Sequence, residues 1–236
     1  TPTPIPPRGR LALGRWLPEA ERYDIVIHDL ATGAETQVIP SASQPAFSRD
    51  GSLLAYRSWQ DNALGLFVAS ADGTERWLLT QDAHEEDLWP AWAPDGSSLA
   101  FASTRLGDGL NRVYVTPSQG GPATNVTYGG YVDWSPDGSW LAVQSCVGGD
   151  CGIMLTPPDG GELEQLTTDA SDGAPTWSPN GQYIAFHSHR EGKWSLYVMR
   201  SDGSGLLQLT DAAADDCVPV WSPDGLYLAF RSDRGG

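Results

Sequence analysis

The chain has 236 residues, with 14 lysines and arginines against 30 aspartates and glutamates, so its formal net charge is −16 at pH 7. Such a charge argues against a nucleic-acid partner, because phosphate binding needs a concentrated positive surface. Hydrophobic residues make up 40% of the chain, enough for a core, yet no apolar run approaches the roughly 20 residues of a membrane span. The 27 glycines and 18 prolines indicate many turns between short strands.

The first residues form a proline-rich segment, TPTPIPPR, before the pattern of the chain changes. Proline fixes φ and removes a backbone donor, which favours an extended polyproline II conformation. We therefore predict a linker over residues 1–8 and a single domain over residues 9–236.

One pattern recurs along the rest of the chain. It is an aromatic residue, then Ser or Ala, then in most copies Pro-Asp-Gly, and it ends the segments 45–51, 90–96, 132–138, 175–181 and 219–225. Proline presets φ at the first turn position and glycine accepts a positive φ, so each copy predicts a tight turn. A period of a little over forty residues is typical of a repeat architecture.

Each repeat continues with the same order of strand-forming segments. An alternating run follows the turn, as in LAFAS at 99–103 and IAFHS at 184–188, and a short apolar segment comes next, as in VYV at 113–115 and LYV at 196–198. A fourth segment ends in Leu-Thr or Val-Thr. Four antiparallel strands per repeat are typical of a propeller blade. The sequence therefore predicts an all-β propeller with four-stranded antiparallel blades.

The two ends of the repeat array are incomplete. Residues 10–16, 24–30 and 35–39 predict second, third and fourth strands that lack a first, whereas residues 219–232 predict only a first and a second strand. This total divides evenly into neither five nor six blades. A five-bladed ring with one strand to spare and an incomplete six-bladed ring therefore both stay open.

The repeated W-S-P-D-G, the L/I-A-F-x-S-x-R after it, and the later L-Y-V-M-x-x-D-G and L-x-L-T resemble the TolB-type, WD40-like (PD40) β-propeller repeat over residues 9–234. The resemblance implies a propeller that is usually six-bladed. Such propellers occur in bacterial envelope proteins, in sensor ectodomains, as gating domains of peptidases and in a pectin-fragment lyase. The resemblance thus implies a fold but does not choose an activity. The segment CVGGDC at 146–151 departs from the repeat.

Catalytic and structural-metal motifs are missing from the sequence. There is no G-x-S-x-G, no C-x-x-C, and His84-Glu85 is followed by Leu88 where a metalloprotease would have its second histidine. We therefore expect no enzymatic activity within this chain.

The loops that connect successive repeats are acidic and point to a binding face. In a propeller these loops lie on the same face as the hairpins between second and third strands, around the mouth of the central channel. A ring of carboxylates there would attract cations or a basic partner, and Ca²⁺ is a possible ligand. The alternative is that the loops of an acidic protein are simply solvated by Asp and Glu. The candidate ligand-binding residues are Asp82, His84, Glu85, Glu86, Asp87, Trp89, Trp59, Asp169, Asp172, His189, Arg190, Asp215 and Asp216.

Several of these residues have a structural alternative. Arg105, Arg190 and Arg234 recur at one hairpin position, so we expect them to pair with loop aspartates and lock blade to blade. Trp59 and Trp89 break the repeat pattern and suit either stacking on a ligand or plugging a loop. His28 and His187 are expected to be packing residues.

Cysteine placement predicts one disulfide. Cys146 and Cys151 bracket Val-Gly-Gly-Asp, and facing positions of a hairpin can meet disulfide geometry. The bridge favours an oxidising compartment and leaves Cys217 free or meant for an outside partner.

Three functions remain open from the sequence. The leading hypothesis is a non-catalytic, monomeric, extracytoplasmic module that binds a protein, peptide or glycan at its acidic channel face. The second is a lyase or hydrolase acting on oligosaccharides, with His84 or His189 as acid–base. The third is a structural ring or sensor ectodomain that orients neighbouring domains of a longer protein.

Overall fold

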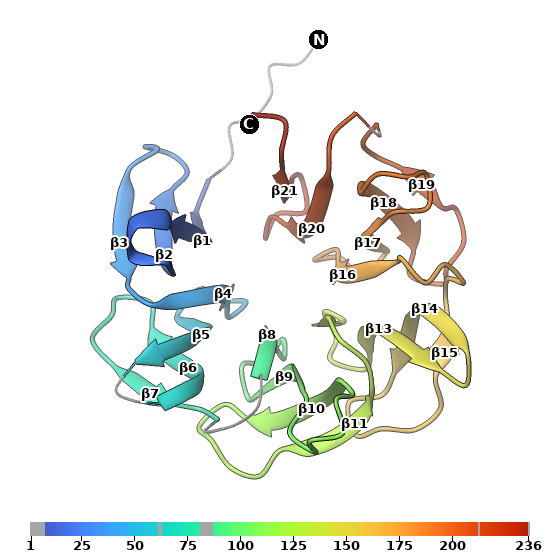
Figure 1. The fold of residues 1–236 in the computed structure, drawn as a ribbon, viewed down its shortest axis with the longest axis horizontal. Helices are drawn as coiled ribbons and strands as arrows, with labels where there is room; N and C mark the ends of the chain where they lie inside the picture. Colours follow the sequence, from blue (N-terminus) through green and yellow to red (C-terminus); the bar gives the residue numbers. More distant parts are fainter. Residues whose placement is uncertain (1–7, 61–62, 81–86, 212, 236) are drawn as a thin grey trace.

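The fold is described from a computed structural model for residues 8–60, 63–80, 87–211 and 213–235. Over these ranges the chain forms 21 strands and one short 3₁₀ turn, η1 (Pro18–Ala20). The sheets follow one another around a ring (Figure 1), which confirms the predicted all-β propeller. The predicted linker lies almost wholly outside these ranges and stays a prediction.

The strands pair into six antiparallel sheets, which we call sheets A to F in chain order. Sheet A contains β1 (Arg10–Leu17), β2 (Arg22–Asp29) and β3 (Glu35–Ile39). Sheet B contains β4 (Ala42–Phe47), β5 (Leu53–Gln60), β6 (Ala63–Ser70) and β7 (Arg76–Leu78). Sheet C contains β8 (Asp87–Trp92), β9 (Ser98–Ser103), β10 (Arg112–Pro117) and β11 (Thr124–Tyr128). Sheet D contains β12 (Val132–Trp134), β13 (Leu141–Val147), β14 (Asp150–Thr156) and β15 (Glu164–Gln165). Sheet E contains β16 (Gly173–Trp177), β17 (Tyr183–Ser188), β18 (Ser195–Arg200) and β19 (Leu207–Gln208). Sheet F contains β20 (Asp216–Trp221) and β21 (Leu228–Ser232).

The arrangement accounts for the incomplete ends of the repeat array. Sheets A to E, with three or four strands each, are the five blades of the described propeller, and sheet F adds a two-stranded ribbon after them. The first strands β4, β8, β16 and β20 lie nearest the centre of the ring (Figure 1).

An aspartate side chain holds each Ser-Pro-Asp-Gly turn. In sheet D, Asp137 accepts hydrogen bonds from the Ser135 hydroxyl at 2.6 Å and from the Ser139 N–H at 3.0 Å. These bonds lower the pKa of Asp137. Gly138 follows with φ of 77°, a conformation that glycine adopts without strain.

The turns also contact one another around the ring. The Pro136 ring lies 3.7 Å from the position that a Cβ would take at Gly181, and Pro179 lies 3.6 Å from the corresponding position at Gly225. Each proline therefore packs on the turn of the next sheet.

The core lies between neighbouring sheets. Trp92, Trp134 and Trp177 are each less than a tenth exposed. Trp177 packs with residues of both sheets D and E, including Ile153 and Phe186. The repeating indoles are thus the wedges between blades that their period predicts.

The end repeats are less well covered than the sequence pattern implies. Phe47 and Trp221, which occupy the repeating aromatic position, are only half-buried. Sheet F has two strands, so Phe230 is 41% exposed, whereas the equivalent Phe186 of sheet E is fully buried.

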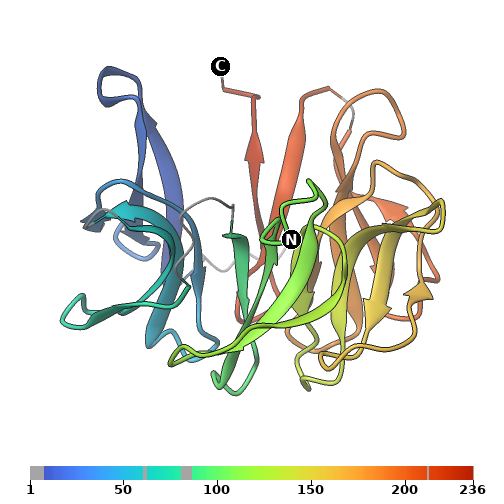
Figure 2. The ribbon, with the colours of Figure 1, turned by 60° about the horizontal axis from the view of Figure 1, so that its bottom comes forward.

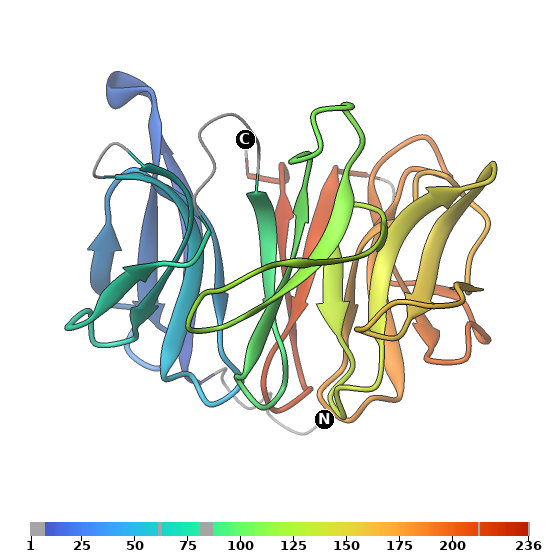
Figure 3. The ribbon, with the colours of Figure 1, turned by 90° about the horizontal axis from the view of Figure 1, so that it is seen from below.

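The ring has two ends that differ in their connections. The Ser-Pro-Asp-Gly turns gather at one end, which we call the turn face, and the inter-sheet loops and second-to-third-strand hairpins gather at the other, the loop face. In Figure 3 the loop face is at the top, and Figure 2 shows the strands running between the two ends. Within the described ranges the structure contains no helix with the length and apolar character that a membrane crossing requires.

Candidate functional site

Three carboxylates of the loop face are buried against arginines. Asp87 begins β8, and both its oxygens accept from Arg105 Nη2, at 3.0 and 3.1 Å. Asp172 accepts from Arg190 Nη2 in the same way, at 2.5 and 2.7 Å. The two aspartates are at most 2% exposed, so their charges are matched inside the fold rather than presented to a ligand.

The third pair, Asp216 with Arg234, corrects part of the expectation for the arginines. In all three pairs the aspartate and the arginine belong to one repeat, so the main ion pair fixes a blade internally and does not lock blade to blade. Arg234 also reaches Asp211, which follows β19 of sheet E, at 3.2 Å between Nη2 and Oδ1. That contact is exposed.

The repeats that lack the aspartate also lack the arginine. Ala42 and Gly129 stand at the aspartate position of sheets B and D, and Gln60 and Val147 stand at the arginine position. The aspartate and the arginine are thus either both present or both absent in each of these repeats, as expected for a pair with a structural role. Sheet D uses a disulfide instead: Cys146 and Cys151 face each other across β13 and β14 and are bonded, which confirms that prediction.

The remaining predicted acids do not form one cluster in the described structure. Asp169 accepts from the Ser171 hydroxyl and N–H, which lowers the pKa of Asp169, and Asp215 accepts from the Trp194 N–H at 3.1 Å. Among the described residues no group of three or more His, Cys, Asp or Glu is placed to hold a metal ion. Asp82, His84, Glu85 and Glu86 lie outside those residues, so the calcium hypothesis stays a prediction.

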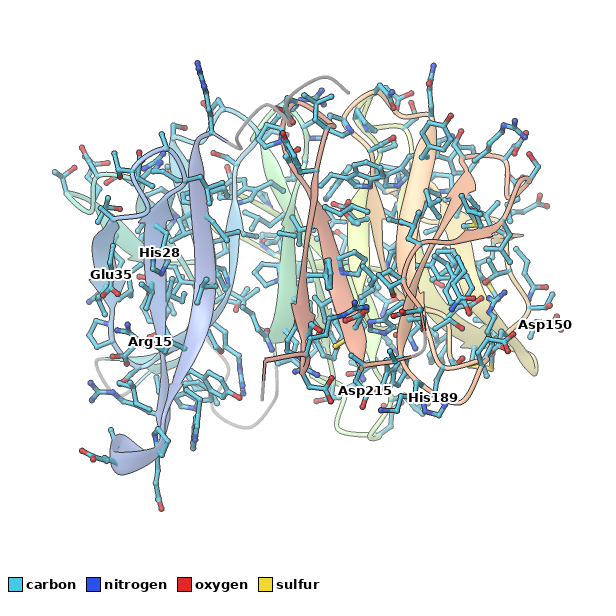
Figure 4. All side chains as sticks on the ribbon, turned by 90° about the horizontal axis from the view of Figure 1, so that it is seen from above. Arg15, His28, Glu35, Asp150, His189 and Asp215 are labelled. Carbon is cyan, nitrogen blue, oxygen red and sulfur yellow. A yellow bond between two sulfur atoms is a disulfide. The ribbon has the colours of Figure 1, made fainter. Side chains whose placement is uncertain are left out.

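An aromatic cluster gathers instead around the inner strands at the loop face. The rings of Trp89 and Tyr131 stack at 4.0 Å between centroids, and Tyr131 meets the edge of His187 at 5.9 Å. His187 in turn contacts Trp194 at 4.7 Å, and His189 contacts Trp194 at 5.3 Å. We call these five residues the aromatic cluster. They come from sheets C, D and E, and Figure 4 shows that His189 and Asp215 lie close together at this end of the ring.

A backbone bulge places Trp89 in the cluster. Trp89 has φ of 52°, and the register of β8 with β9 shifts between Leu88 and Ala91. The Trp89 N–H donates to Gln44 Oε1 of sheet B at 2.9 Å. The same left-handed bulge recurs at Gln44, Ala174 and Val218. The bulge is therefore a property of the repeat, and each repeat places a different side chain there.

His187 is the buried centre of the cluster. Its Nδ1 accepts the Val218 N–H at 3.1 Å, so the neutral ring carries its proton on Nε2. Burial lowers the pKa of His187 to about 4, and the positive charge of Arg231 acts in the same direction. Gly173 admits this packing, because a Cβ there would lie 2.8 Å from His187 Nε2 and from Gln144 Oε1.

The sequence predicts part of this cluster. Trp89 and His189 are candidates and belong to it, His187 is expected to be a packing residue and is buried, and Tyr131 and Trp194 are not singled out. Trp59 lies on the sheet B hairpin, is 48% exposed, and has Arg57 over its ring at 4.3 Å. The signal available in the sequence was that Trp89, Tyr131 and Trp194 are aromatics outside the repeating Trp position.

Comparison with known proteins gives a family model, described as the TolB beta propeller domain, that matches residues 10–192 and 169–236. The Bacillus subtilis protein named "Uncharacterized peptidase YuxL" is 30% identical over 131 residues, which are 50% of this chain and 19% of that protein. The crystal structure of TolB from Acinetobacter baumannii superposes with a TM-score of 0.78 at 22% identity, covering 93% of this chain and 57% of the other. An oligogalacturonate lyase in complex with manganese has a TM-score of 0.62 at 17% identity, covering 92% of this chain and 65% of the other. This chain spans less than two thirds of each of these proteins.

Proposed function

We propose, from the premise that this chain belongs to the TolB beta propeller domain family, that it is a non-catalytic binding module whose ligand, a peptide or protein segment, docks on the loop face at the aromatic cluster. The observation that carries the proposal is the stack of Trp89 on Tyr131 beside His187, built from three different sheets. Aromatic side chains that converge from several elements are a common way to hold a ligand.

The charge arrangement supports the aromatic cluster rather than the acidic rim as the contact surface. Asp87, Asp172 and Asp216 form ion pairs with arginines of their own repeats, so they offer no free carboxylate to a ligand. Trp89, Tyr131 and Trp194 are half-buried, which leaves part of each ring for a partner.

We also propose that the protein works in an oxidising, extracytoplasmic compartment. The support is the Cys146–Cys151 disulfide, since such bonds persist mainly outside the reducing cytosol. Cys217 is free and buried, so it is shielded from exchange with that bridge.

A comparison of two aromatic pairs tests the binding site. Peptide and glycan arrays are probed with wild type, with Trp89→Ala, and with the control Trp16→Ala, whose ring pairs with Tyr23 at 4.9 Å on sheet A. We expect peptide binding that Trp89→Ala weakens by at least about tenfold and that Trp16→Ala leaves unchanged. Equal binding by both variants, with both folded by circular dichroism, would refute the site.

A further inference from the structure

The turn face of the ring is crossed by one arginine. Arg49 stands where four other turns have proline, and it belongs to sheet B. Its Nη1 donates to the Pro136 carbonyl of sheet D at 3.0 Å, and its Nη2 donates to the Pro179 carbonyl of sheet E at 3.3 Å. Sheets D and E lie on the opposite side of the ring from sheet B (Figure 1), so the guanidinium lies across the axis.

This crossing replaces the local contact that the other turns make. The proline of each of three turns packs on the next turn's glycine, but no atom of the described residues lies within 4 Å of the Cβ position at Gly96, the glycine that follows Arg49 around the ring. The Arg49 side chain does not pack on Gly96 and instead forms its hydrogen bonds across the axis. A polypeptide that ran along the axis from the loop face to the turn face would meet this guanidinium.

Ten described inner positions near the loop face carry no carboxylate, although the chain has a net charge of −16, and we call them the inner surface. They belong to two repeat positions: the third residue before the repeating aromatic and the residue before the conserved serine of each second strand. They are Gln44, Trp89, Tyr131, Ala174 and Val218, and Arg57, Ala102, Gln144, His187 and Arg231.

Arg231 is an exposed cation of this surface, whereas Arg57, at the same repeat position in sheet B, is half-buried over Trp59. Arg231 lies on β21 opposite Cys217, at the repeat position of His187. Cys217 is followed by Val218, whose N–H donates to His187, so strand register brings Arg231 next to the aromatic cluster. The positive charge of Arg231 also contributes to the lowered pKa of His187. Val218 is 38% exposed.

We propose that this surface captures the C-terminal carboxylate of a peptide chain, with Arg231 pairing with the carboxylate and the aromatic cluster packing on the last side chains. The inference rests on the proposed function and names its ligand. The Arg49 crossing favours a chain end over a chain that passes through. Arg231 favours a carboxylate over an ammonium terminus.

The overall charge favours a peptide over a polyanion. An acidic polysaccharide would bring many negative charges to a protein of charge −16 and gain attraction only at the inner surface. A peptide with a basic or uncharged body adds no such repulsion, and its single terminal carboxylate meets Arg231. The overall charge thus favours a ligand whose one negative group is its end.

The experiment uses a hexapeptide library with basic and uncharged bodies, each member made with a free C-terminal carboxylate and as the amide. Binding is measured by titration calorimetry to wild type, to Arg231→Gln, and to the control Arg200→Gln, an exposed arginine of β18. We expect amidation and Arg231→Gln each to weaken binding by at least about tenfold, and Arg200→Gln to have no effect. Peptides extended by four residues beyond the recognised end are expected to bind poorly to wild type and better to Arg49→Pro.

The outcomes separate this inference from the proposed function. Amides and extended peptides that bind wild type as tightly as free acids, with binding still lost in Trp89→Ala, would overturn the carboxylate assignment and leave the binding module intact. No peptide binding at all would overturn both. Oligogalacturonate that binds more tightly than any peptide would overturn the peptide assignment.

Discussion

Sheets D and E fix the same place on the loop face by different chemistry. In sheet E, the hairpin between β17 and β18 is tied to the start of β16 by Arg190 and the buried Asp172. In sheet D, Gly129 and Val147 stand at those positions, and the hairpin between β13 and β14 is closed by the Cys146–Cys151 bond.

The difference teaches that what the repeat requires at this end is a restrained hairpin rather than a particular residue pair. The ion pair of sheet E joins three strands and depends on desolvated charges, because Asp172 is fully buried. The disulfide of sheet D joins only two strands, and Gly148 and Gly149 make the tight turn between them. The two sheets should therefore respond to different perturbations.

The largest effect is expected from breaking the ion pair of sheet E. Arg190→Ala leaves the buried carboxylate of Asp172 without its partner, which should lower the free energy of unfolding by about 3–5 kcal/mol. Urea denaturation measures this loss. The double variant Asp172→Ala/Arg190→Ala removes the stranded charge and should recover part of the stability; a double variant less stable than Arg190→Ala would contradict this account.

The disulfide of sheet D should contribute less. It closes a short loop, for which the chain-entropy relation gives about 2 kcal/mol. Cys146→Ser/Cys151→Ser should therefore lower stability by about that amount, and dithiothreitol should destabilise the wild type but not the variant. If dithiothreitol destabilised both proteins equally, its effect would not come from the Cys146–Cys151 bond.

The pH dependence should distinguish the two sheets by sign. The pKa of His187 in sheet E is lowered to about 4 by burial, so stability is lost as pH falls from about 6.5 towards 4, because the unfolded chain takes up the proton first. Desolvation raises the pKa of Asp133 in sheet D to about 6, so its contribution is lost as pH rises from about 4 through 6. Each should change the free energy of unfolding by about 3 kcal/mol.

His187→Asn separates these opposing effects, since asparagine keeps an acceptor for the Val218 N–H. Denaturation between pH 4 and pH 7 should show a weaker acid-side loss in this variant than in wild type. An unchanged pH profile would show that His187 does not control it.

The smallest effect is expected at the exposed contact between Arg234 and Asp211. The two side chains are 45% and 73% exposed, so Asp211→Ala should change stability by less than about 1 kcal/mol. Thermal denaturation of this variant beside Arg190→Ala sharpens the contrast between exposed and buried pairs. A loss as large as that of Arg190→Ala would mean that the inter-sheet contact is the one that matters.

Most of the fold could be predicted from the sequence because the same turn and strand pattern recurs in five repeats. The turn aspartates, the wedge tryptophans and the Leu-Thr endings each recur at fixed places; the Thr80, Thr167 and Thr210 hydroxyls, for example, all accept from the third strand of their own sheet. A single ambiguous segment is then decided by its four equivalents.

The candidate site was harder to predict for the opposite reason. Trp89 and Tyr131 share one repeat position, but Gln44, Ala174 and Val218 stand there in the other repeats, and His187 and Trp194 occupy two further positions. No recurring residue type therefore marks the cluster in the sequence. Trp89 also depends on a left-handed bulge that its sequence does not announce. The acidic loops misled in part. The recurring arginines predict pairing with loop aspartates, but only the structure shows that each main pair lies within one repeat and buries the aspartate.

The proline–glycine contacts of the turn face have a consequence for how such a chain can change length. Pro94 packs on Gly138, Pro136 on Gly181, and Pro179 on Gly225, so each junction presents its neighbour with the same pair of shapes. A whole repeat gained or lost by duplication or deletion would leave matching surfaces at the new seam. An insertion of part of a repeat, by contrast, would misalign every seam beyond it.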